Sequence, residues 1–150
     1  MKDDIINRIF NFKEIAGVKN WYFPWFNDLL KGFRRGELTI LTGQTGAGKT
    51  TFLSQYTLGF AEAQVPTLWG SFEIKNEVMG TTMLSQFAKL DLTTWTELLN
   101  KYIEEFDTLP LQFMKFYGAT DPEELFATMD YSVYEHDIAH IVLDNLQFMI

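Results

Sequence analysis

The sequence contains no cysteine and only two histidines in its 150 residues. Disulfide bonds, thiol catalysis and cysteine-ligated zinc are therefore excluded. The two histidines, His136 and His140, are four residues apart, a spacing that would let them share a metal ion on one face of a helix. Residues 138–143 are predicted to form a β-strand instead, which would separate the two rings, so we do not expect a metal site there.

Long hydrophobic runs and an excess of positive charge are also lacking. No apolar run approaches the ~20 residues that a membrane-spanning helix needs, and the opening Met1-Lys2-Asp3-Asp4 resembles neither a secretory signal nor a transit peptide. The formal net charge is -8, so a surface-wide footprint of Lys and Arg for nucleic acid is absent. We expect no membrane partner, and we expect any contact with DNA to be local or to lie outside this chain.

A glycine-rich phosphate-binding pattern stands out among the residues that are present. The stretch from Gly43 to Thr50 matches G-x-x-x-x-G-K-[ST] at every fixed position. Its glycines let successive backbone N–H groups face phosphate oxygens, Lys49 would reach the β and γ phosphates, and the Thr50 hydroxyl would bind Mg²⁺. The predicted nucleotide-binding residues are Gly43, Gln44, Thr45, Gly46, Ala47, Gly48, Lys49, Thr50 and Thr51.

The flanking residues decide between a phosphate site and a glycine-rich surface loop that contains Lys-Thr by chance. Residues 37–42 are apolar and rich in β-formers, which predicts a strand. Residues 51–64 repeat apolar side chains at Phe52, Tyr56 and Phe60, a helical spacing. Strand, loop and helix in this order favour the nucleoside triphosphate site.

The remaining chain alternates predicted strands and helices, and 47% of its residues are hydrophobic, enough for one domain with a core. Strands are predicted over residues 67–72, over 111–116 towards a sheet edge, and over 139–144 at the sheet centre. This order selects an α/β domain, a parallel sheet flanked by helices and joined by right-handed crossovers.

Three helices are predicted between these strands. Residues 78–89 carry a methionine-rich face, which we assign to the core. Thr94 and Glu97 have the spacing of a capping box, which would open a helix to residue 107. Asp121 followed by Pro122 predicts a capped helix to about residue 135. Its predicted core face consists of Leu125, Phe126, Met129 and Val133.

Two acids are predicted to lie beside the loop, because ligands of open α/β sheets bind beyond the carboxyl ends of the strands. Asp144 ends the last apolar run and suits a hold on Mg²⁺. Glu73 follows the strand over residues 67–72 and is our candidate to orient and deprotonate an attacking water. The alternative for Glu73 is an exposed acid at a strand end with no chemical role.

The first 26 residues carry two apolar features. Residues 1–12 place Ile5, Ile6, Ile9 and Phe10 at helical spacing on a segment too short to be stable alone. This segment must dock either on its own domain or on a neighbouring subunit. Residues 21–26 are a dense aromatic cluster, which could stack bases but which we assign to the core because few basic residues accompany it.

Several blocks of the sequence resemble the RecA-like motor domain of the Twinkle family of mitochondrial replicative DNA helicases and, more distantly, hexameric helicases of the DnaB type. The blocks that carry the resemblance are residues 29–32, 36–39, 43–50, 67–74 and 137–149. The likeness implies a linker over residues 1–24 and a RecA-like motor domain over residues 25–150. It also implies an ATP-driven, Mg²⁺-dependent ring, a hexamer or heptamer, that moves along single-stranded DNA and separates a duplex.

The resemblance further implies roles for individual residues. It implies that Glu73 and Lys49 act in catalysis, that Thr50 and Asp144 hold the magnesium ion, and that Asn145 and Gln147 are nucleotide-state sensors. The implied location is the mitochondrial matrix; a cytoplasmic or viral protein is the alternative.

Departures from the family pattern limit these expectations. The family continues past the magnesium acid with an inserted strand, DNA-binding loops and an arginine finger. The resemblance therefore implies a RecA-like P-loop fold cut short after the strand that ends in Asp144, the N-terminal half of a motor domain. We expect weak or no helicase activity from such a fragment, because the transferred phosphate would lack its arginine. The alternative functions are a RecA-like ATP-binding regulatory module and a small-molecule kinase of the P-loop class.

Overall fold

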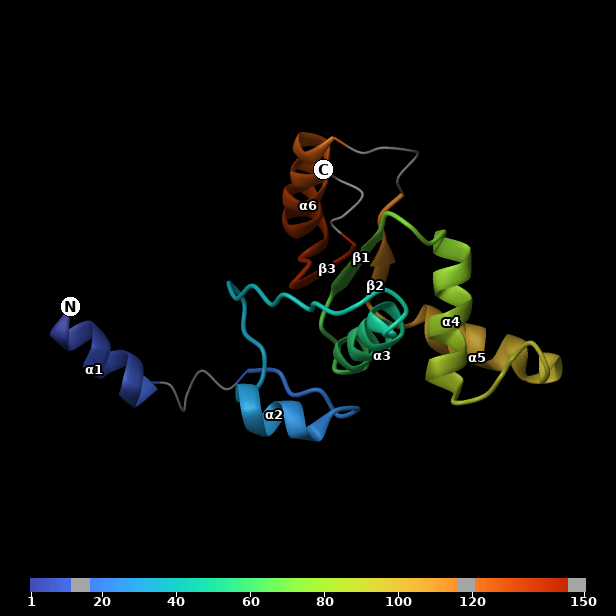
Figure 1. The fold of residues 1–150 in the computed structure, drawn as a ribbon, viewed down its shortest axis with the longest axis horizontal. Helices are drawn as coiled ribbons and strands as arrows, with labels where there is room; N and C mark the ends of the chain where they lie inside the picture. The colour runs from blue at the N-terminus through green and yellow to red at the C-terminus, as the bar shows by residue number, and fades with distance from the viewer. Residues whose placement is uncertain (12–16, 116–120, 146–150) are drawn as a thin grey trace.

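The computed structural model describes residues 1–11, 17–115 and 121–145 and contains a parallel three-stranded sheet (Figure 1). The strands are β1 (Thr67–Ser71), β2 (Leu111–Phe113) and β3 (His140–Asp144), in the order β2-β1-β3. All five residues of β1 pair with β3 in a continuous parallel register. The predicted α/β class is therefore confirmed, as are the positions of the three strands.

The position of β3 in the sheet differs from the prediction. We expected residues 139–144 to form a central strand, but β1 lies in the middle and is buried along its whole length. Within the described residues β3 pairs only with β1, so it is an edge strand and is partly exposed. A continuous apolar run predicts burial but does not say which strand takes the centre.

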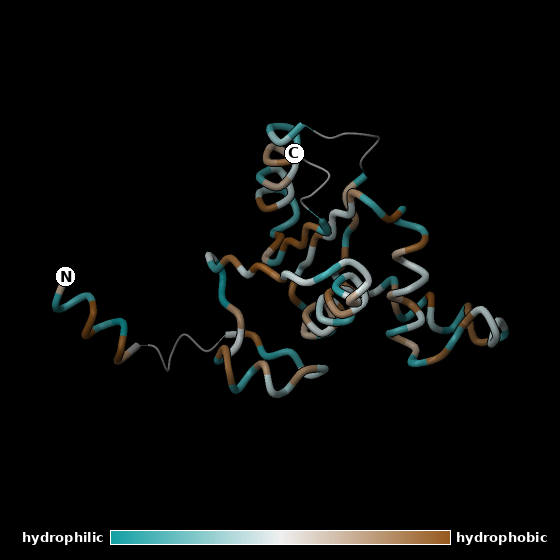
Figure 2. Tube along the Cα trace, in the orientation of Figure 1, coloured by the Kyte–Doolittle hydropathy of each residue, from teal (hydrophilic) through white to brown (hydrophobic). Residues whose placement is uncertain are grey.

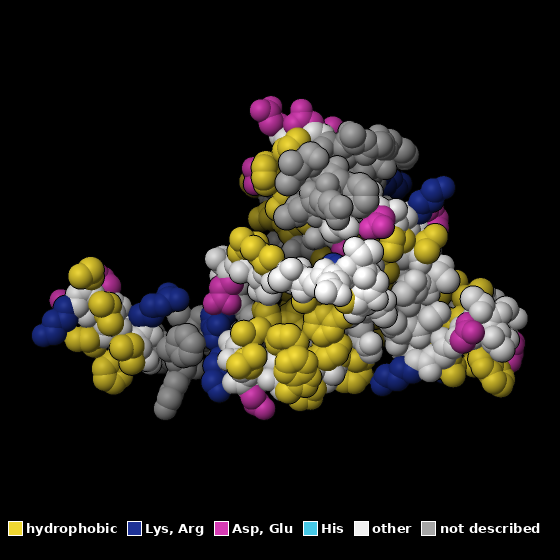
Figure 3. Space-filling model, in the orientation of Figure 1, with side chains coloured by type: hydrophobic (Ala, Val, Ile, Leu, Met, Phe, Trp, Pro, Cys, Tyr) yellow, Lys and Arg dark blue, Asp and Glu magenta, His cyan; other side chains and the backbone are white. Residues whose placement is uncertain are grey.

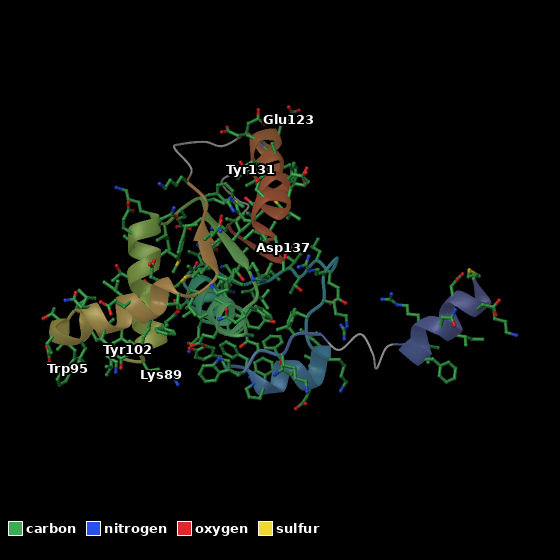
Figure 4. The ribbon with its side chains drawn as sticks, turned by 180° about the vertical axis from the view of Figure 1, so that it is seen from behind. Lys89, Trp95, Tyr102, Glu123, Tyr131 and Asp137 are labelled. Carbon is green, nitrogen blue, oxygen red and sulfur yellow. The ribbon has the colours of Figure 1, made fainter. Side chains whose placement is uncertain are left out.

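The strand predicted over residues 37–42 is wrong. This segment is irregular and exposed, and it forms no ladder with any described strand. A strand is stabilised by hydrogen bonds to a neighbour, which apolar composition alone does not supply. Figure 2 shows that the segment is nevertheless hydrophobic, as is β3. Just before this segment, Arg35 forms an ion pair with Asp137, at the end of α6 (Pro122–His136). The distance from Arg35 Nη2 to Asp137 Oδ1 is 3.5 Å, and Asp137 is labelled in Figure 4.

Helices cover both faces of the sheet. On one face α3 (Lys49–Glu62) and α4 (Asn76–Ala88) pack on β1, with α5 (Leu99–Asp107) beyond them (Figure 1). The core of this face contains Leu58, Trp69, Met79, Met83 and Val142. On the other face α6 covers a second core cluster, which contains Leu68, Met114, Leu125 and Ile138. The methionine-rich face of α4 is therefore core, as predicted.

The helix α6 begins as predicted but exposes more of its surface. Asp121 Oδ1 accepts a hydrogen bond from Glu123 N at 3.0 Å, which confirms the predicted cap. Leu125 is fully buried, whereas Phe126 and Val133 are exposed, so half of the predicted core face is wrong. The sheet beneath α6 is narrow, and it covers only one side of the helix.

The predicted capping box at Thr94 is also wrong. The chain enters a short 3-10 helix, η1 (Thr96–Leu98), and only then α5. Thr94 Oγ1 donates to Asp91 Oδ2 at 3.1 Å, and Thr93 bonds the other oxygen of the same carboxylate. These hydrogen bonds lower the pKa of Asp91. The Thr94 hydroxyl is thus bonded to Asp91, three residues earlier, and does not cap the start of a helix.

The N-terminal helix α1 (Lys2–Asn11) lies apart from the rest of the molecule (Figure 1). All its described side chains are exposed, including those of Ile5, Ile9 and Phe10. The helix that we predicted is therefore present, but it is not docked on its own domain. Among the described residues, no helix is long and apolar enough to cross a membrane.

Residues 17–34 dock on α3 through a buried asparagine. Asn20 is 0% exposed, and its Nδ2 donates to Tyr56 O at 2.6 Å while its Oδ1 accepts from Tyr22 N at 3.1 Å. The Asn27 side chain accepts a hydrogen bond from Asn20 N and donates one to Asn20 O, each of 2.8 Å. Gly59 on α3 faces this amide so closely that a Cβ there would overlap it. The contact is thus both polar and sterically tight.

Aromatic rings complete this docking. The inward rings of Phe23 and Phe33 pack against α3, at centroid distances of 4.8 Å from Phe52 and 5.3 Å from Phe60 respectively. The core assignment of the aromatic cluster is therefore correct in part, because Trp21 and Trp25 are exposed. Figure 3 shows the hydrophobic surface that results over α2 (Pro24–Leu30).

His140 packs into the same region from the first position of β3. Its ring lies 4.7 Å from that of Phe60, and its Nδ1 is 3.4 Å from Thr67 Oγ1. Burial lowers the pKa of His140 to about 4, because desolvation disfavours the charged imidazolium. His136 ends α6, so the two histidines lie on different elements, as predicted.

Candidate active site

The glycine-rich loop, residues 43–48, is exposed above the first turn of α3 (Figure 1). Gly46 and Gly48 have φ angles of 78° and 83°, in the left-handed region that favours glycine. A Cβ at either position would meet nothing within 4 Å, so backbone conformation and not space requires glycine here. The first amides of α3 have no acceptor within the helix, which leaves them available to an anion.

Lys49 holds its ammonium group across this loop. Its Nζ donates to Gly43 O at 2.7 Å and to Gln44 O at 2.9 Å. Both acceptors belong to the loop itself, so the positive charge lies where the loop would surround phosphate oxygens. The loop conformation and this cation together fit a bound triphosphate.

Thr50 and Asp144 meet between the loop and the sheet. Thr50 Oγ1 donates to Asp144 Oδ2 at 2.7 Å, across 94 positions of sequence. Asp144 ends β3 and is 7% exposed. A hydroxyl and a carboxylate are oxygen ligands of the kind that Mg²⁺ prefers, with substrate oxygens and water completing its shell. Among the described residues, no group of three or more His, Cys, Asp or Glu side chains is placed to hold a metal ion.

Glu73 lies directly after β1 and is paired with an amide. Asn145 Nδ2 donates to Glu73 Oε2 at 3.1 Å, and Glu73 is otherwise exposed. The turn that carries Glu73 is fixed by a hydrogen bond of 3.0 Å from Ile74 N to Ser71 Oγ. Phe72 N donates to Asp144 O at 2.9 Å, which keeps the ends of the two strands together.

The structure thus brings the sequence-predicted residues together in two hydrogen-bonded pairs at one edge of the sheet. Thr50 with Asp144 forms one pair and Glu73 with Asn145 forms the other. Because β1 and β3 are parallel and adjacent, Glu73 and Asp144 must lie at the same edge. Gln147, the second predicted sensor, lies outside the described residues.

Sequence reasoning missed two polar residues beside the first turn of α3. Ser54, one turn after Thr50, is 0% exposed, and its hydroxyl lies 2.9 Å from Gln86 Oε1. Gln86 on α4 also donates through Nε2 to Thr51 O at 3.0 Å. No local pattern indicates this contact, because the partners are more than thirty positions apart.

A comparison with known families agrees with this geometry. Residues 8–150 match the family model described as an AAA domain. The match spans the glycine-rich loop, all three strands and both acids of the site.

Proposed function

We propose that this chain binds ATP with Mg²⁺ and hydrolyses it, since it belongs to the AAA domain family of P-loop nucleoside triphosphatases. The observation that carries this proposal is the 2.7 Å hydrogen bond from Thr50 to Asp144. This hydrogen bond joins the residue that follows Lys49 to the end of β3, so that a hydroxyl and a carboxylate, both oxygen ligands suited to Mg²⁺, lie together next to the phosphate loop.

Each residue of the site has a distinct task in this proposal. Lys49 and the loop amides bind and orient the β and γ phosphates. Thr50 and Asp144 would hold Mg²⁺, which neutralises charge on the phosphate oxygens when it is bound. Glu73 takes a proton from the attacking water as its oxygen bonds to the γ-phosphorus and the bond to the leaving diphosphate breaks. Asn145 donates to the Glu73 carboxylate and so orients its free oxygen.

We further propose that this ATPase is the motor of a ring-forming DNA helicase. Support comes from the resemblance of residues 29–32, 36–39, 67–74 and 137–149 to replicative helicases, including the mitochondrial Twinkle family. The exposed helix α1 supports a ring as well, because its apolar face is uncovered and would be buried against a second copy. Single-stranded DNA is the proposed track and the mitochondrial matrix the proposed location.

The ATPase proposal is tested by Mg²⁺-dependent ATP turnover in the chain and in two matched variants. Asp144→Asn removes the negative charge beside Thr50 and should lower turnover by about 10²-fold, since it weakens the hold on the metal. Asp130→Asn changes an exposed acid on α6 and should have no effect. Equal turnover in both variants, or a chain that binds no ATP, would contradict the proposal.

Single-stranded DNA separates the helicase from its alternatives. A helicase motor should turn ATP over faster when single-stranded DNA is added. A regulatory module would bind ATP without DNA-dependent turnover, and a kinase would pass the phosphate to a small acceptor and ignore DNA. Ring formation is measured separately by sedimentation. Ile9→Asp should reduce the assembled fraction, whereas Asn7→Asp on the same helix adds the same charge to a polar position.

A further inference from the structure

The contact between α3 and α4 combines adaptable apolar packing with one directional polar junction. Met79 and Met83 of α4 lie in the core beside Leu58 of α3. Methionine side chains adapt to small displacements, so this packing holds the helices together but does not fix their rotation. Hydrogen bonds have preferred directions and therefore do fix it.

The polar junction consists of Ser54, Gln86 and the carbonyl of Thr51. Gln86 Nε2 donates to Thr51 O at 3.0 Å, and the Ser54 hydroxyl lies 2.9 Å from Gln86 Oε1 and 2.9 Å from the same carbonyl. A carbonyl oxygen only accepts, so the amide must turn its NH₂ group towards Thr51 and its oxygen towards Ser54. Ser54 is fully buried, and without Gln86 its hydroxyl would keep only the Thr51 carbonyl as an acceptor.

This junction connects the two halves of the proposed catalytic site. Thr51 follows Thr50 directly, so its carbonyl belongs to the turn that carries the magnesium-side hydroxyl. The helix α4 begins three residues after Glu73 and is anchored at its start, where Asn76 Nδ2 donates to Met114 O at 2.7 Å. Rotation of α3 against α4 would therefore move Thr50 relative to Glu73.

We infer that Gln86 is a positioning residue for this site: by holding Thr51 and Ser54 it sets the first turn of α3, and with it the Thr50 hydroxyl, relative to Glu73. Gln86 touches neither reacting atom and acts only through the turn it holds. The effect of Gln86 on catalysis rests on the proposed ATPase function. The positioning of the first turn of α3 by Gln86 is a property of the chain without nucleotide.

Hydrogen exchange of the nucleotide-free chain tests the positioning directly. Gln86→Leu keeps approximate volume and removes both hydrogen bonds, and Gln112→Leu makes the same change at an exposed position of β2. The amides of residues 52–56 should exchange about tenfold faster in Gln86→Leu, with residues 57–61 unchanged, and Gln112→Leu should match the parent chain. Unchanged exchange at residues 52–56, or equal acceleration along all of α3, would overturn the inference.

A second variant separates positioning from a loss of folding. Ser54→Ala combined with Gln86→Leu removes both side chains of the junction, including the hydroxyl that would still bond Thr51 O. It should be no less stable to urea than Gln86→Leu alone and should keep the fast exchange of residues 52–56. If the double variant regained parental exchange, the remaining Ser54 hydroxyl and not the loss of Gln86 would have caused the fast exchange, and the inference would be overturned.

ATP binding with and without Mg²⁺ gives a readout that a merely structural residue would not move. In Gln86→Leu the Kd for ATP should rise about fivefold to tenfold with Mg²⁺ and by less in EDTA, because the Thr50 hydroxyl contributes only through the metal. Equal changes in both conditions, or none, would overturn the inference. A parent chain that binds no ATP would instead refute the proposed function, while the exchange experiment would still decide the role of Gln86.

Discussion

The two ends of α3 are held in opposite ways. The first turn is only partly buried, and polar contacts from Asp144 and Gln86 hold its threonines. The second half is buried from Tyr56 to Ala61 among aromatic rings, with the amide of Asn20 against it. One helix therefore combines an open end, suited to a ligand, with an enclosed end that fixes the helix in the domain.

This difference separates function from stability along a single element. Hydrophobic burial is strong but has no preferred direction, whereas the few polar contacts at the open end have defined geometry and small net energy. Substitutions at the open end should therefore change chemistry with little change in stability. Substitutions around the enclosed end should do the reverse.

The largest expected effect is at the open side of the site. Glu73→Gln keeps the size of the side chain but removes the base, so ATP hydrolysis should fall by about 10²–10⁴-fold while ATP binding is retained. Steady-state turnover and equilibrium binding measure the two quantities. Glu77→Gln, an exposed acid in the first turn of α4, is the control. Normal hydrolysis by Glu73→Gln would leave Glu73 without a catalytic role.

Lys49→Ala should have the next largest effect. It removes the only side-chain cation of the phosphate loop and its charge-assisted hydrogen bonds, so ATP binding should weaken by about 10²-fold. The urea midpoint should not change, since the Lys49 ammonium group bonds to the carbonyls of two exposed loop residues. Lys101→Ala on α5 is the control for loss of one positive charge. A drop in stability that matches the loss of binding would break the division between the two ends.

Asn20→Ala should act at the enclosed end. The substitution leaves Tyr56 O and Tyr22 N without their partner and opens a cavity beside Gly59, which should lower the free energy of unfolding by about 2–3 kcal/mol. Urea denaturation measures this change. Asn100→Ala, at an exposed position of α5, should change stability by less than about 0.5 kcal/mol. Equal stabilities would show that the aromatic rings alone dock residues 17–34.

The smallest expected effect is the change of stability with pH that is due to His140, which packs against the enclosed end of α3. Burial lowers the pKa of His140 to about 4, whereas the unfolded chain has a value of about 6.5. The contribution of the neutral ring is therefore complete above pH 6.5 and is lost as the pH falls towards 4, because the unfolded chain takes up the proton first. Between pH 7.5 and pH 5 the free energy of unfolding should fall by about 1–2 kcal/mol.

His140→Gln isolates this contribution from the other titrating groups. The variant should lose stability less steeply than the parent chain over the same pH range, as measured by urea denaturation at each pH. His136→Gln, at the exposed end of α6, is the matched control. Identical slopes for the parent chain and His140→Gln would show that water reaches the ring.

The parts of the structure that the sequence predicts are those with local causes. The glycine-rich loop, the cap at Asp121 and the apolar strands depend on residues close together in sequence, and all three are present. The prediction of a strand over residues 37–42 failed because a strand also needs a neighbour, which sequence pattern does not supply. The prediction of a cap at Thr94 was wrong because the Thr94 hydroxyl donates to the carboxylate of Asp91, a competing acceptor nearby in sequence.

The members of the candidate site could be proposed from the sequence, but the contacts between them could not. A strand end and a phosphate loop identify Asp144 and Thr50 as members, yet the bond between them spans most of the chain. Asn20 and Gln86 gave no signal, because a polar residue in a short loop or on a half-buried helix is ordinary in sequence. Their importance comes from distant acceptors, the carbonyls of Tyr56 and Thr51.

The uncovered run from Leu38 to Thr42 has a consequence for the behaviour of the purified chain. Leu38 is 87% and Ile40 77% exposed, and the run contains neither proline nor charge. Such β-prone segments are templates for aggregation when a free strand edge is near. We expect the chain to precipitate as its concentration rises, and a gatekeeper charge at Thr39 to raise its solubility.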